Sequence, residues 1–329
     1  MLVTEVSRFG GPEVLTPRQA PDPVAGPGQV VVRTSAADVL LVDTMIRSGR
    51  GVDYFPVTPP YVPGNGVAGL VISAGRGVEP SWVGRAVVAH TGGSGGRGGY
   101  AERAVVPATD LIPVPSGLGL ADAAALLLDG STAFMLTGRV SIRLADWVLV
   151  TAAGGGMGVL LVQLARALGG RVIGAARGPA KRDLVRNAGA RATVDYSEPG
   201  WAEQVRELTD GHGADVVFDG TGGELGRAAF EVTVRGGEFS AHGTTDGYFT
   251  RIDPEEAARR EITVHRLGDH DPVAFRANAT KALAVAAAGR VRPVIGQTFP
   301  LDRAAEAHAA IEARATLAKT LLLTDQITA

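Results

Sequence analysis

A glycine-rich segment between two apolar runs carries the clearest chemical signal in this sequence. Residues 148–151 form a short β-branched run, residues 152–158 read AAGGGMG, and an apolar helical pattern covers residues 159–165. This order is typical of a strand, a tight turn and a helix. Glycine lets main-chain N–H groups approach a pyrophosphate, and a helix N-terminus adds about half a positive charge. The segment therefore predicts a turn that binds a dinucleotide.

The spacing of the glycines is a variant of a known dinucleotide-binding pattern. Ala153-x-Gly155-x-x-Gly158 departs from G-x-G-x-x-G by having alanine at the first position. The string alone is a weak signal, but a strand before it, a helix after it and a second strand about 20 residues on support dinucleotide binding. The alternative is a glycine-rich turn with a purely structural role.

The residues after the second predicted strand indicate which dinucleotide is bound. An NAD-dependent enzyme normally has Asp or Glu at this strand end, where it binds the ribose 2′-hydroxyl. This chain has Arg177 there and Lys181 one helical turn later, and the nearest acid, Asp183, falls in the predicted helix. Because cations pair with a 2′-phosphate, these residues predict NADPH. The alternative is that both cations are solvated surface charges.

The elements needed to position this turn follow from the change of pattern along the chain. The first third is rich in Pro and Gly, with short β-branched runs at residues 29–33 and 67–72, which predicts an irregular, mainly β domain. Helical and strand patterns alternate from about residue 121, which predicts a doubly wound parallel sheet in an α/β domain. The predicted strands are 148–151, 171–175, 192–195, 215–219 and 238–241, and the predicted helices are 121–128, 159–168, 181–188 and 281–288.

Length, charge and composition exclude several classes of protein. A chain of 329 residues predicts two domains, and a net charge of −2 argues against binding to nucleic acid or anionic lipid. The chain has no cysteine, so disulfides, thiolate nucleophiles and cysteine-bound metals are excluded. The N-terminus lacks the pattern of a signal peptide, and the uncharged stretch 147–165 is broken by glycines rather than suited to a membrane. We therefore expect a cytoplasmic protein.

Several short motifs, taken together and in order, resemble one family over essentially the whole chain. They are FGGPEVL at 9–15, DTMIRSG at 43–49, VPG at 62–64, GSTA at 130–133, AAGGGMG at 152–158 and EARAT at 312–316. The chain resembles the zinc-independent quinone oxidoreductases, the zeta-crystallin-like group of the medium-chain dehydrogenase/reductase superfamily.

The resemblance implies an architecture and a set of cofactor contacts. It implies a GroES-like, mainly β catalytic domain (residues 1–121 and 290–329), a Rossmann dinucleotide-binding domain (residues 122–289), an active site between them and a homodimer. It also implies which residues hold NADPH. These are Thr132 near the nicotinamide, Gly155, Gly156, Met157 and Gly158 on the pyrophosphate, Lys181 and Tyr196 around the 2′-phosphate, and also His242, Gly243, Arg266 and Arg314.

The sequence departs from its relatives at the metal ligands. Zinc-dependent relatives use cysteine and a Gly-His-Glu motif, where this chain has Gly64-Asn65-Gly66. The six histidines show no paired metal-ligand spacing apart from a loose pair, His265 and His270. We therefore expect no metal site, and Lewis-acid catalysis of alcohol oxidation is not expected.

The substrate pocket implied by the resemblance also differs. Many quinone oxidoreductases have Asn and Tyr where this chain has Leu40 and Met45, which predicts a more apolar pocket for a small hydrophobic electrophile. Tyr54 is the candidate polar group for the substrate oxygen, with a wall residue as the alternative. Asp43 and Arg47 are expected to pair and to order the helix that lines the pocket.

The chemistry that needs the fewest parts is hydride transfer from NADPH to a quinone or an α,β-unsaturated carbonyl compound. The protein then holds both molecules in place, excludes water and stabilises the enolate. Asp129, before Gly130-Ser131-Thr132, is interpreted as a helix cap or a catalytic group. Two alternatives stay open: a trans-acting enoyl reductase of a polyketide-like pathway, and an NADPH-binding protein without turnover.

Overall fold

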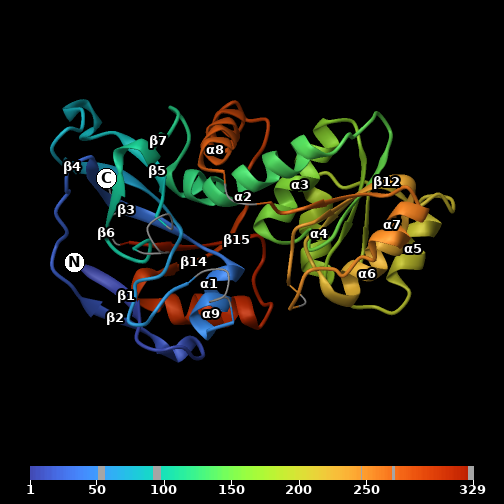
Figure 1. Cartoon of the computed structure of the whole chain (residues 1–329), viewed down its shortest axis with the longest axis horizontal. Helices are drawn as coiled ribbons and strands as arrows, with labels where there is room; N and C mark the ends of the chain where they lie inside the picture. Colours follow the sequence, from blue (N-terminus) through green and yellow to red (C-terminus); the bar gives the residue numbers. More distant parts are fainter. Residues whose placement is uncertain (51–55, 92–97, 246, 269–270, 325–329) are drawn as a thin grey trace. The chain divides into compact units, whose positions relative to one another are not determined.

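The computed structural model describes residues 1–50, 56–91, 98–245, 247–268 and 271–324, and its helices and strands are labelled in Figure 1. The chain divides into two compact units. The first unit comprises Met1–Ser131 and Ala279–Ala329, and the second comprises Thr132–Asn278. The boundaries expected from the sequence, near residues 121 and 290, differ from this division and remain a prediction of domain limits.

The second unit is built on a parallel sheet. Its strands, among the described residues, are β8 (Trp147–Val150), β9 (Arg171–Ala175), β10 (Ala192–Val194), β11 (Ala214–Asp219), β12 (Thr233–Ala241) and β13 (Thr263–Arg266). Their order is β10-β9-β8-β11-β12-β13, and every neighbouring pair is parallel. The order reverses between β8 and β11, which makes the sheet doubly wound and confirms the predicted fold class.

Helices of the second unit alternate with these strands. They are α3 (Gly156–Ala167), α4 (Pro179–Asn187), α5 (Trp201–Leu208), α6 (Gly223–Glu231) and α7 (Pro254–Arg259). The strands bury continuous apolar runs, as parallel strands covered on both faces do. Leu149, Ile173 and Val217 are fully buried in one core cluster with Phe230 and Phe239. Five of the six strands in the described part of this unit were predicted. The sixth, β13, has the sequence TVHR and was missed because it lies at a sheet edge and lacks an apolar pattern.

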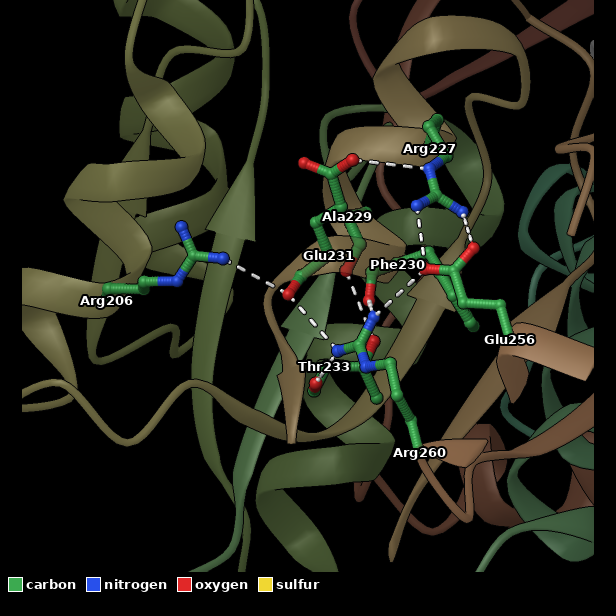
Figure 2. Close-up of polar contacts among 8 residues, drawn as sticks. All are labelled: Arg206, Arg227, Ala229, Phe230, Glu231, Thr233, Glu256 and Arg260. Atoms are coloured by element: carbon green, nitrogen blue, oxygen red, sulfur yellow. Dashed lines mark hydrogen bonds and ion pairs between the residues drawn. The ribbon is translucent and has the colours of Figure 1, made fainter. Parts of the chain in front are cut away.

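Arginines hold the C-terminal end of α6 against the neighbouring elements (Figure 2). Arg206 Nη2 donates to the carbonyl oxygen of Glu231 at 3.2 Å, and Arg260 donates to the same oxygen at 3.2 Å. Arg227 makes a two-point ion pair with Glu256, at 2.7 and 2.8 Å. The last carbonyl groups of a helix have no partner within it, so Arg206 and Arg260 supply hydrogen bonds that α6 itself cannot make. Part of the arginine content therefore serves the structure.

The first unit is built on mainly antiparallel sheets. Its strands are β1 (Leu2–Val6), β2 (Leu15–Gln19), β3 (Gln29–Val39), β4 (Gly66–Ala74), β5 (Ala86–His90), β6 (Arg103–Pro107), β7 (Ile112–Pro113), β14 (Ile295–Pro300) and β15 (Lys319–Leu323). β1 pairs with β2, and the larger sheet has the order β14-β15-β3-β4-β5-β7, with β6 also paired to β3. β15 joins β3 in antiparallel register, from Thr320 opposite Val39 to Leu323 opposite Ala36. The C-terminal segment thus completes the sheet of the N-terminal one.

The described residues form four further α-helices. α1 (Leu41–Ser48) and α9 (Ala304–Glu312) belong to the first unit, whereas α2 (Leu120–Arg139) and α8 (Pro272–Ala287) run across the boundary between the units. Short 3₁₀ turns are η1 (Pro12–Val14), η2 (Pro80–Trp82), η4 (Ala108–Asp110) and η5 (Leu301–Arg303). Within the described residues, α2 is as long and apolar as a membrane span, but 56% of its most apolar window is buried, as in the core helix of a globular protein. Residues 147–165 form β8, the glycine turn and most of α3, as predicted.

Candidate functional site

The carboxyl ends of β8, β11 and β12 are joined by a buried hydrogen-bond network. Asp219, at the end of β11, accepts from the hydroxyl groups of Thr151 at 2.9 Å and Thr221 at 2.7 Å. Its carbonyl oxygen accepts from the backbone N–H groups of His242 at 3.1 Å and Gly243 at 3.0 Å. Asp219 is completely buried. Asp219 orders the sheet edge at which doubly wound folds bind ligands, a role that was not predicted from the sequence.

The predicted glycine turn lies at this edge, between β8 and α3. Ala152 has a φ of +50°, and Ala153 N–H donates to the carbonyl oxygen of Ala175 on β9 at 3.1 Å. Gly155 is the N-cap of α3. Because glycine has no side chain to cap the helix, the first N–H groups of α3 can bind a ligand.

The two glycines of the pattern have different surroundings. A Cβ atom at Gly158 would lie 2.4 Å from the carbonyl oxygen of Ala152 and 2.7 Å from the Cα of Ala153. Gly158 is therefore required for α3 to pack closely on the turn. A Cβ atom at Gly155 would meet only the oxygen of Ala152, at 3.4 Å, an ordinary contact. Apart from its chain neighbours, no other heavy atom of the described residues lies within 4 Å of this position, so the turn leaves room for a ligand beside Gly155, as a pyrophosphate site requires.

The cations predicted to bind the 2′-phosphate follow β9. Arg177 is exposed directly after the strand. Lys181 lies on α4, and a Cβ atom at Gly154 would be 2.8 Å from the Cβ and 3.0 Å from the Cγ of Lys181. The side chain of Lys181 therefore lies against the glycine turn, although the two segments are far apart in sequence.

The structure also brings to this place an acid that was not predicted from the sequence. Asp195, after β10, accepts from Gly178 N–H at 2.7 Å and from Ser197 N–H at 3.0 Å. Burial raises the pKa of Asp195, but the hydrogen bonds from Ser197 and Gly178 and the charge of Arg182 outweigh it and leave the pKa below its ordinary value. Only acids following β9 in sequence were considered, whereas the parallel sheet places the end of β10 beside it.

The predicted cofactor residues are divided between the two units. Thr132, Gly155, Gly156, Met157, Gly158, Arg177, Lys181, Tyr196, His242, Gly243 and Arg266 belong to the second unit, and Arg314 to the first. His242 is buried, and its Nδ1 lies 3.1 Å from the carbonyl oxygen of Ser240. Burial lowers the pKa of His242 to about 4 against the opposing charge of Asp219, so the imidazole is neutral at pH 7. The cofactor roles of these residues remain predictions.

The residues predicted to line the substrate pocket belong to the first unit. Leu40 precedes α1, and Asp43, Met45 and Arg47 lie on it, while Tyr54 is outside the described residues. Asp43 accepts from the N–H of Leu40 at 2.8 Å and from the amide of Asn65 at 2.7 Å. Burial and the neighbouring charge of Asp38 raise the pKa of Asp43 to about 7.

The predicted pairing of Asp43 with Arg47 is wrong. Arg47 forms its ion pair with Glu312 at the end of α9, and only 1% of the Arg47 side chain is exposed. Asp43 turns back toward the first turn of α1 and toward Asn65, because unpaired N–H groups there attract a carboxylate. Both side chains order α1, but through separate partners.

The interpretation of Asp129 as a helix cap is also wrong, because Asp129 lies within α2. Its carboxylate is 3.2 Å from the ammonium group of Lys319 on β15, which is also 3.4 Å from the carboxylate of Asp38 on β3. We call Asp38, Asp129 and Lys319 the lysine triad. The exposed fractions are 0% for Asp38, 4% for Lys319 and 14% for Asp129. Burial raises the pKa of Asp38 to about 6, and the charges of Asp129 and Asp38 raise that of Lys319 despite its burial.

The first unit also contains a buried histidine that contacts Tyr100. His308 on α9 is completely buried, and its Nε2 lies 2.9 Å from the hydroxyl group of Tyr100. Burial, together with the charge of Arg47, lowers the pKa of His308 to about 3. Since this value lies below the 6.5 of an ordinary histidine, the stabilisation by the neutral ring is complete above pH 6.5 and is lost as the pH falls.

We therefore expect His308→Gln to reduce the acid sensitivity of folding. Between pH 6 and pH 4, the wild type should lose about 1.4 kcal/mol of unfolding free energy per pH unit relative to this variant. Urea unfolding at several pH values measures this difference. His212→Gln, at a half-exposed position, is the matched control. Parallel pH profiles for the wild type and His308→Gln would contradict the expectation.

A doubly wound sheet with a glycine turn at its carboxyl edge, and a separate antiparallel unit completed by the C-terminus, define a two-domain dehydrogenase or reductase. Comparison with family models agrees: residues 26–116 match the alcohol dehydrogenase GroES-like domain, and residues 156–274 match the zinc-binding dehydrogenase domain. The chain belongs to the medium-chain dehydrogenase/reductase superfamily, in its quinone oxidoreductase group, and is an oxidoreductase. This confirms the resemblance inferred from the sequence and the GroES-like fold of the first unit.

Individual relatives extend over the whole chain. A quinone oxidoreductase of Pseudomonas aeruginosa is 33% identical over 97% of this chain and 98% of its own, and a 2-haloacrylate reductase of a Burkholderia species is 32% identical over 98% and 99%. Among solved structures, the Escherichia coli quinone oxidoreductase complexed with NADPH has a TM-score of 0.89, with 26% identity and coverage of 98% and 100%. A mycobacterial protein complexed with NADPH has a TM-score of 0.87, with 33% identity and coverage of 98% and 100%.

The name of one matching family implies zinc, but the residues present do not fit a catalytic zinc site. At the Gly-His-Glu position, the amide of Asn65 donates to Asp43. A Cβ atom at Gly66 would be 3.0 Å from both an oxygen of Asp38 and a methyl group of Leu127, so the place of the glutamate is filled. In the described part of the chain, no three His, Asp or Glu side chains are grouped as metal ligands.

Proposed function

We propose that this chain is an NADPH-dependent reductase that transfers a hydride to a quinone or an α,β-unsaturated carbonyl compound without a metal ion. The observation that carries this proposal is the open space beside Gly155 at the start of α3, at the carboxyl edge of the sheet where the strand order reverses between β8 and β11. Relatives that cover nearly the whole chain are quinone oxidoreductases, and two neighbours in structure were solved with NADPH.

The chain would hold the cofactor with groups from several elements. The N–H groups from Gly155 to Gly158, with Met157 among them, bind the pyrophosphate, and Arg177, Lys181 and Tyr196 surround the 2′-phosphate. Thr132, His242, Gly243, Arg266 and Arg314 complete the set. NADPH, when bound, supplies the hydride. The first carbons of the Lys181 side chain lie beside Gly154, which brings this cation to the turn.

On the substrate side, the chain supplies an apolar pocket and few polar groups. Leu40 and Met45 exclude water from the acceptor, and Tyr54 donates to the oxygen on which negative charge develops. Asp43 and Arg47 are 2% and 1% exposed, so they order α1 rather than contact the acceptor. Asn65 and Gly66 stand where zinc-dependent relatives have the metal ligands His and Glu. This difference supports a reaction without zinc, in which the hydride acceptor is an electron-poor carbon.

Oxidation of NADPH, followed at 340 nm with 1,2- and 1,4-naphthoquinone and with α,β-unsaturated ketones, tests the proposal. Turnover with either class supports it. Stabilisation by NADPH without turnover of any acceptor would instead indicate a protein that binds NADPH without catalysis. Reduction of a carrier-bound enoyl group, but of no free quinone or enone, would indicate a biosynthetic enoyl reductase.

The choice of NADPH over NADH is expected to depend on Arg177 and Lys181. The double substitution Arg177→Ala, Lys181→Ala removes two cations and should weaken NADPH binding by at least about a hundredfold while changing NADH binding only a few-fold, since charged hydrogen bonds contribute about 1.5–3 kcal/mol each. Titration calorimetry with both nucleotides measures this. Arg191→Ala, at an exposed cation before β10, is the control. Equal losses for NADPH and NADH would overturn the assignment.

We further propose that the protein is a cytoplasmic homodimer whose partner is a small hydrophobic electrophile rather than nucleic acid or a membrane. These expectations rest on the net charge of −2 and on the resemblance to its family. Light scattering coupled to size-exclusion chromatography measures the mass, and a monomer at micromolar concentration would contradict the dimer.

A further inference from the structure

The lysine triad carries an unbalanced negative charge. Two carboxylates, from Asp38 and Asp129, share the single ammonium group of Lys319. The charge of Asp38 contributes to the raised pKa of the nearby Asp43, and the cation Arg47 is already paired with Glu312. The three side chains of the lysine triad, taken as a set, therefore carry one net negative charge when both carboxylates are ionised. The other titratable groups near it, Tyr61, Tyr100 and His308, are neutral at pH 7.

Only one member of the triad reaches solvent. Asp38 is completely buried and Lys319 nearly so, whereas 14% of the Asp129 side chain is exposed. Asp129 is therefore the member of the triad whose charge can act on a molecule outside the protein interior. Because Asp129 is partly solvated, its charge acts on a molecule that approaches from solvent, and dissolved salt screens part of this interaction.

The position of Asp129 on α2 relates it to the proposed site. Asp129 and Thr132 are three residues apart in one continuous helix, so their side chains are neighbours on the same face. The proposed function places Thr132 at the nicotinamide, where the acceptor must also lie. A carboxylate one helical turn from the acceptor repels an acceptor that carries a negative charge and has little effect on a neutral one.

We propose, on the basis of the proposed function, that Asp129 selects uncharged acceptors and disfavours those that carry a carboxylate next to the reacting double bond. Quinones, enones and acrylic esters belong to the first class, and 2-haloacrylate, an anion at neutral pH, to the second. The lysine triad thereby separates two substrate classes that are both represented among the relatives of this chain.

The test compares 2-chloroacrylate with its methyl ester at saturating NADPH. The ester and the acid differ in intrinsic reactivity, so the measured quantity is the change in their kcat/KM ratio between variants. Asp129→Asn removes the charge and keeps the shape, and it should change the ratio at least about tenfold in favour of the anion, since tenfold corresponds to about 1.4 kcal/mol of repulsion. Asp122→Asn, the same charge change about two turns earlier on α2, should leave the ratio unchanged.

A second measurement uses the wild type alone and does not depend on how the variant folds. Raising the salt concentration from 20 to 300 mM should reduce the preference for the ester, because the repulsion is screened. An unchanged ratio in Asp129→Asn, an equal change in Asp122→Asn, or a preference insensitive to salt would overturn the inference while the reductase activity itself stands. Absence of turnover with every acceptor would overturn the proposed function and this inference with it.

Discussion

Replacing Lys319 by methionine should lower the free energy of unfolding by about 3–5 kcal/mol, the usual cost of removing one partner from a buried ion pair. The ammonium group is 4% exposed and faces two carboxylates, at 3.4 Å (Asp38) and 3.2 Å (Asp129). Without it, both carboxylates must either stay ionised in a poorly solvated place or take up protons. Either outcome costs free energy at neutral pH.

Two measurements separate this cause from a simple loss of packing. The double variant Asp38→Asn, Lys319→Met should be more stable than Lys319→Met alone, because one buried charge is removed with its partner. The destabilisation should also shrink between pH 8 and pH 5, since the orphaned carboxylates are protonated at lower pH. Urea unfolding of the three proteins tests both points. A loss below about 1 kcal/mol, or one independent of pH, would contradict the electrostatic explanation.

Gly155→Ala should weaken NADPH binding on the order of a hundredfold while leaving the fold intact. The added methyl group meets only the oxygen of Ala152, at 3.4 Å, and the backbone of Gly155 is extended, with a φ of −84°. Alanine is therefore tolerated by the protein itself. The proposed function places the pyrophosphate in the space that the methyl group would fill.

Gly158→Ala provides the contrast within the same turn. Its methyl group would lie 2.4 Å from a carbonyl oxygen, so α3 must move, at a cost of about 1–3 kcal/mol in unfolding free energy. Thermal unfolding without ligand and calorimetric titration with NADPH together distinguish the two substitutions. If Gly155→Ala bound NADPH as the wild type does, the pyrophosphate would not lie at this turn, and the assignment of the site would fail.

The elements that could be predicted are those whose pattern is local. The run from β8 through the glycine turn into α3 was located to within three residues at each end, and β9 was located at its observed limits. Apolar periodicity and glycine spacing act over less than twenty residues, so they are visible without a structure. The alternation of such elements also predicted the doubly wound sheet.

Contacts between distant segments could not be predicted in the same way. The triad joins Lys319 to Asp38, 281 residues earlier, and Asp195 reaches the turn after β9 only because β10 lies beside it. The expected partner of Arg47 was Asp43, four residues away, whereas the actual partner is Glu312. Helical spacing allowed the first pair, and only the packing of α9 near α1 produced the second.

The amino-acid sequence by itself therefore determined the family, the dinucleotide turn and the exclusion of cysteine chemistry, because these depend on which residues follow one another. The tertiary structure alone decided which buried charges balance one another and where one carboxylate remains in excess. The physical reason is that a charge removed from water is stabilised or destabilised by whatever lies within a few ångströms of it, and those neighbours come from strands and helices far apart along the chain.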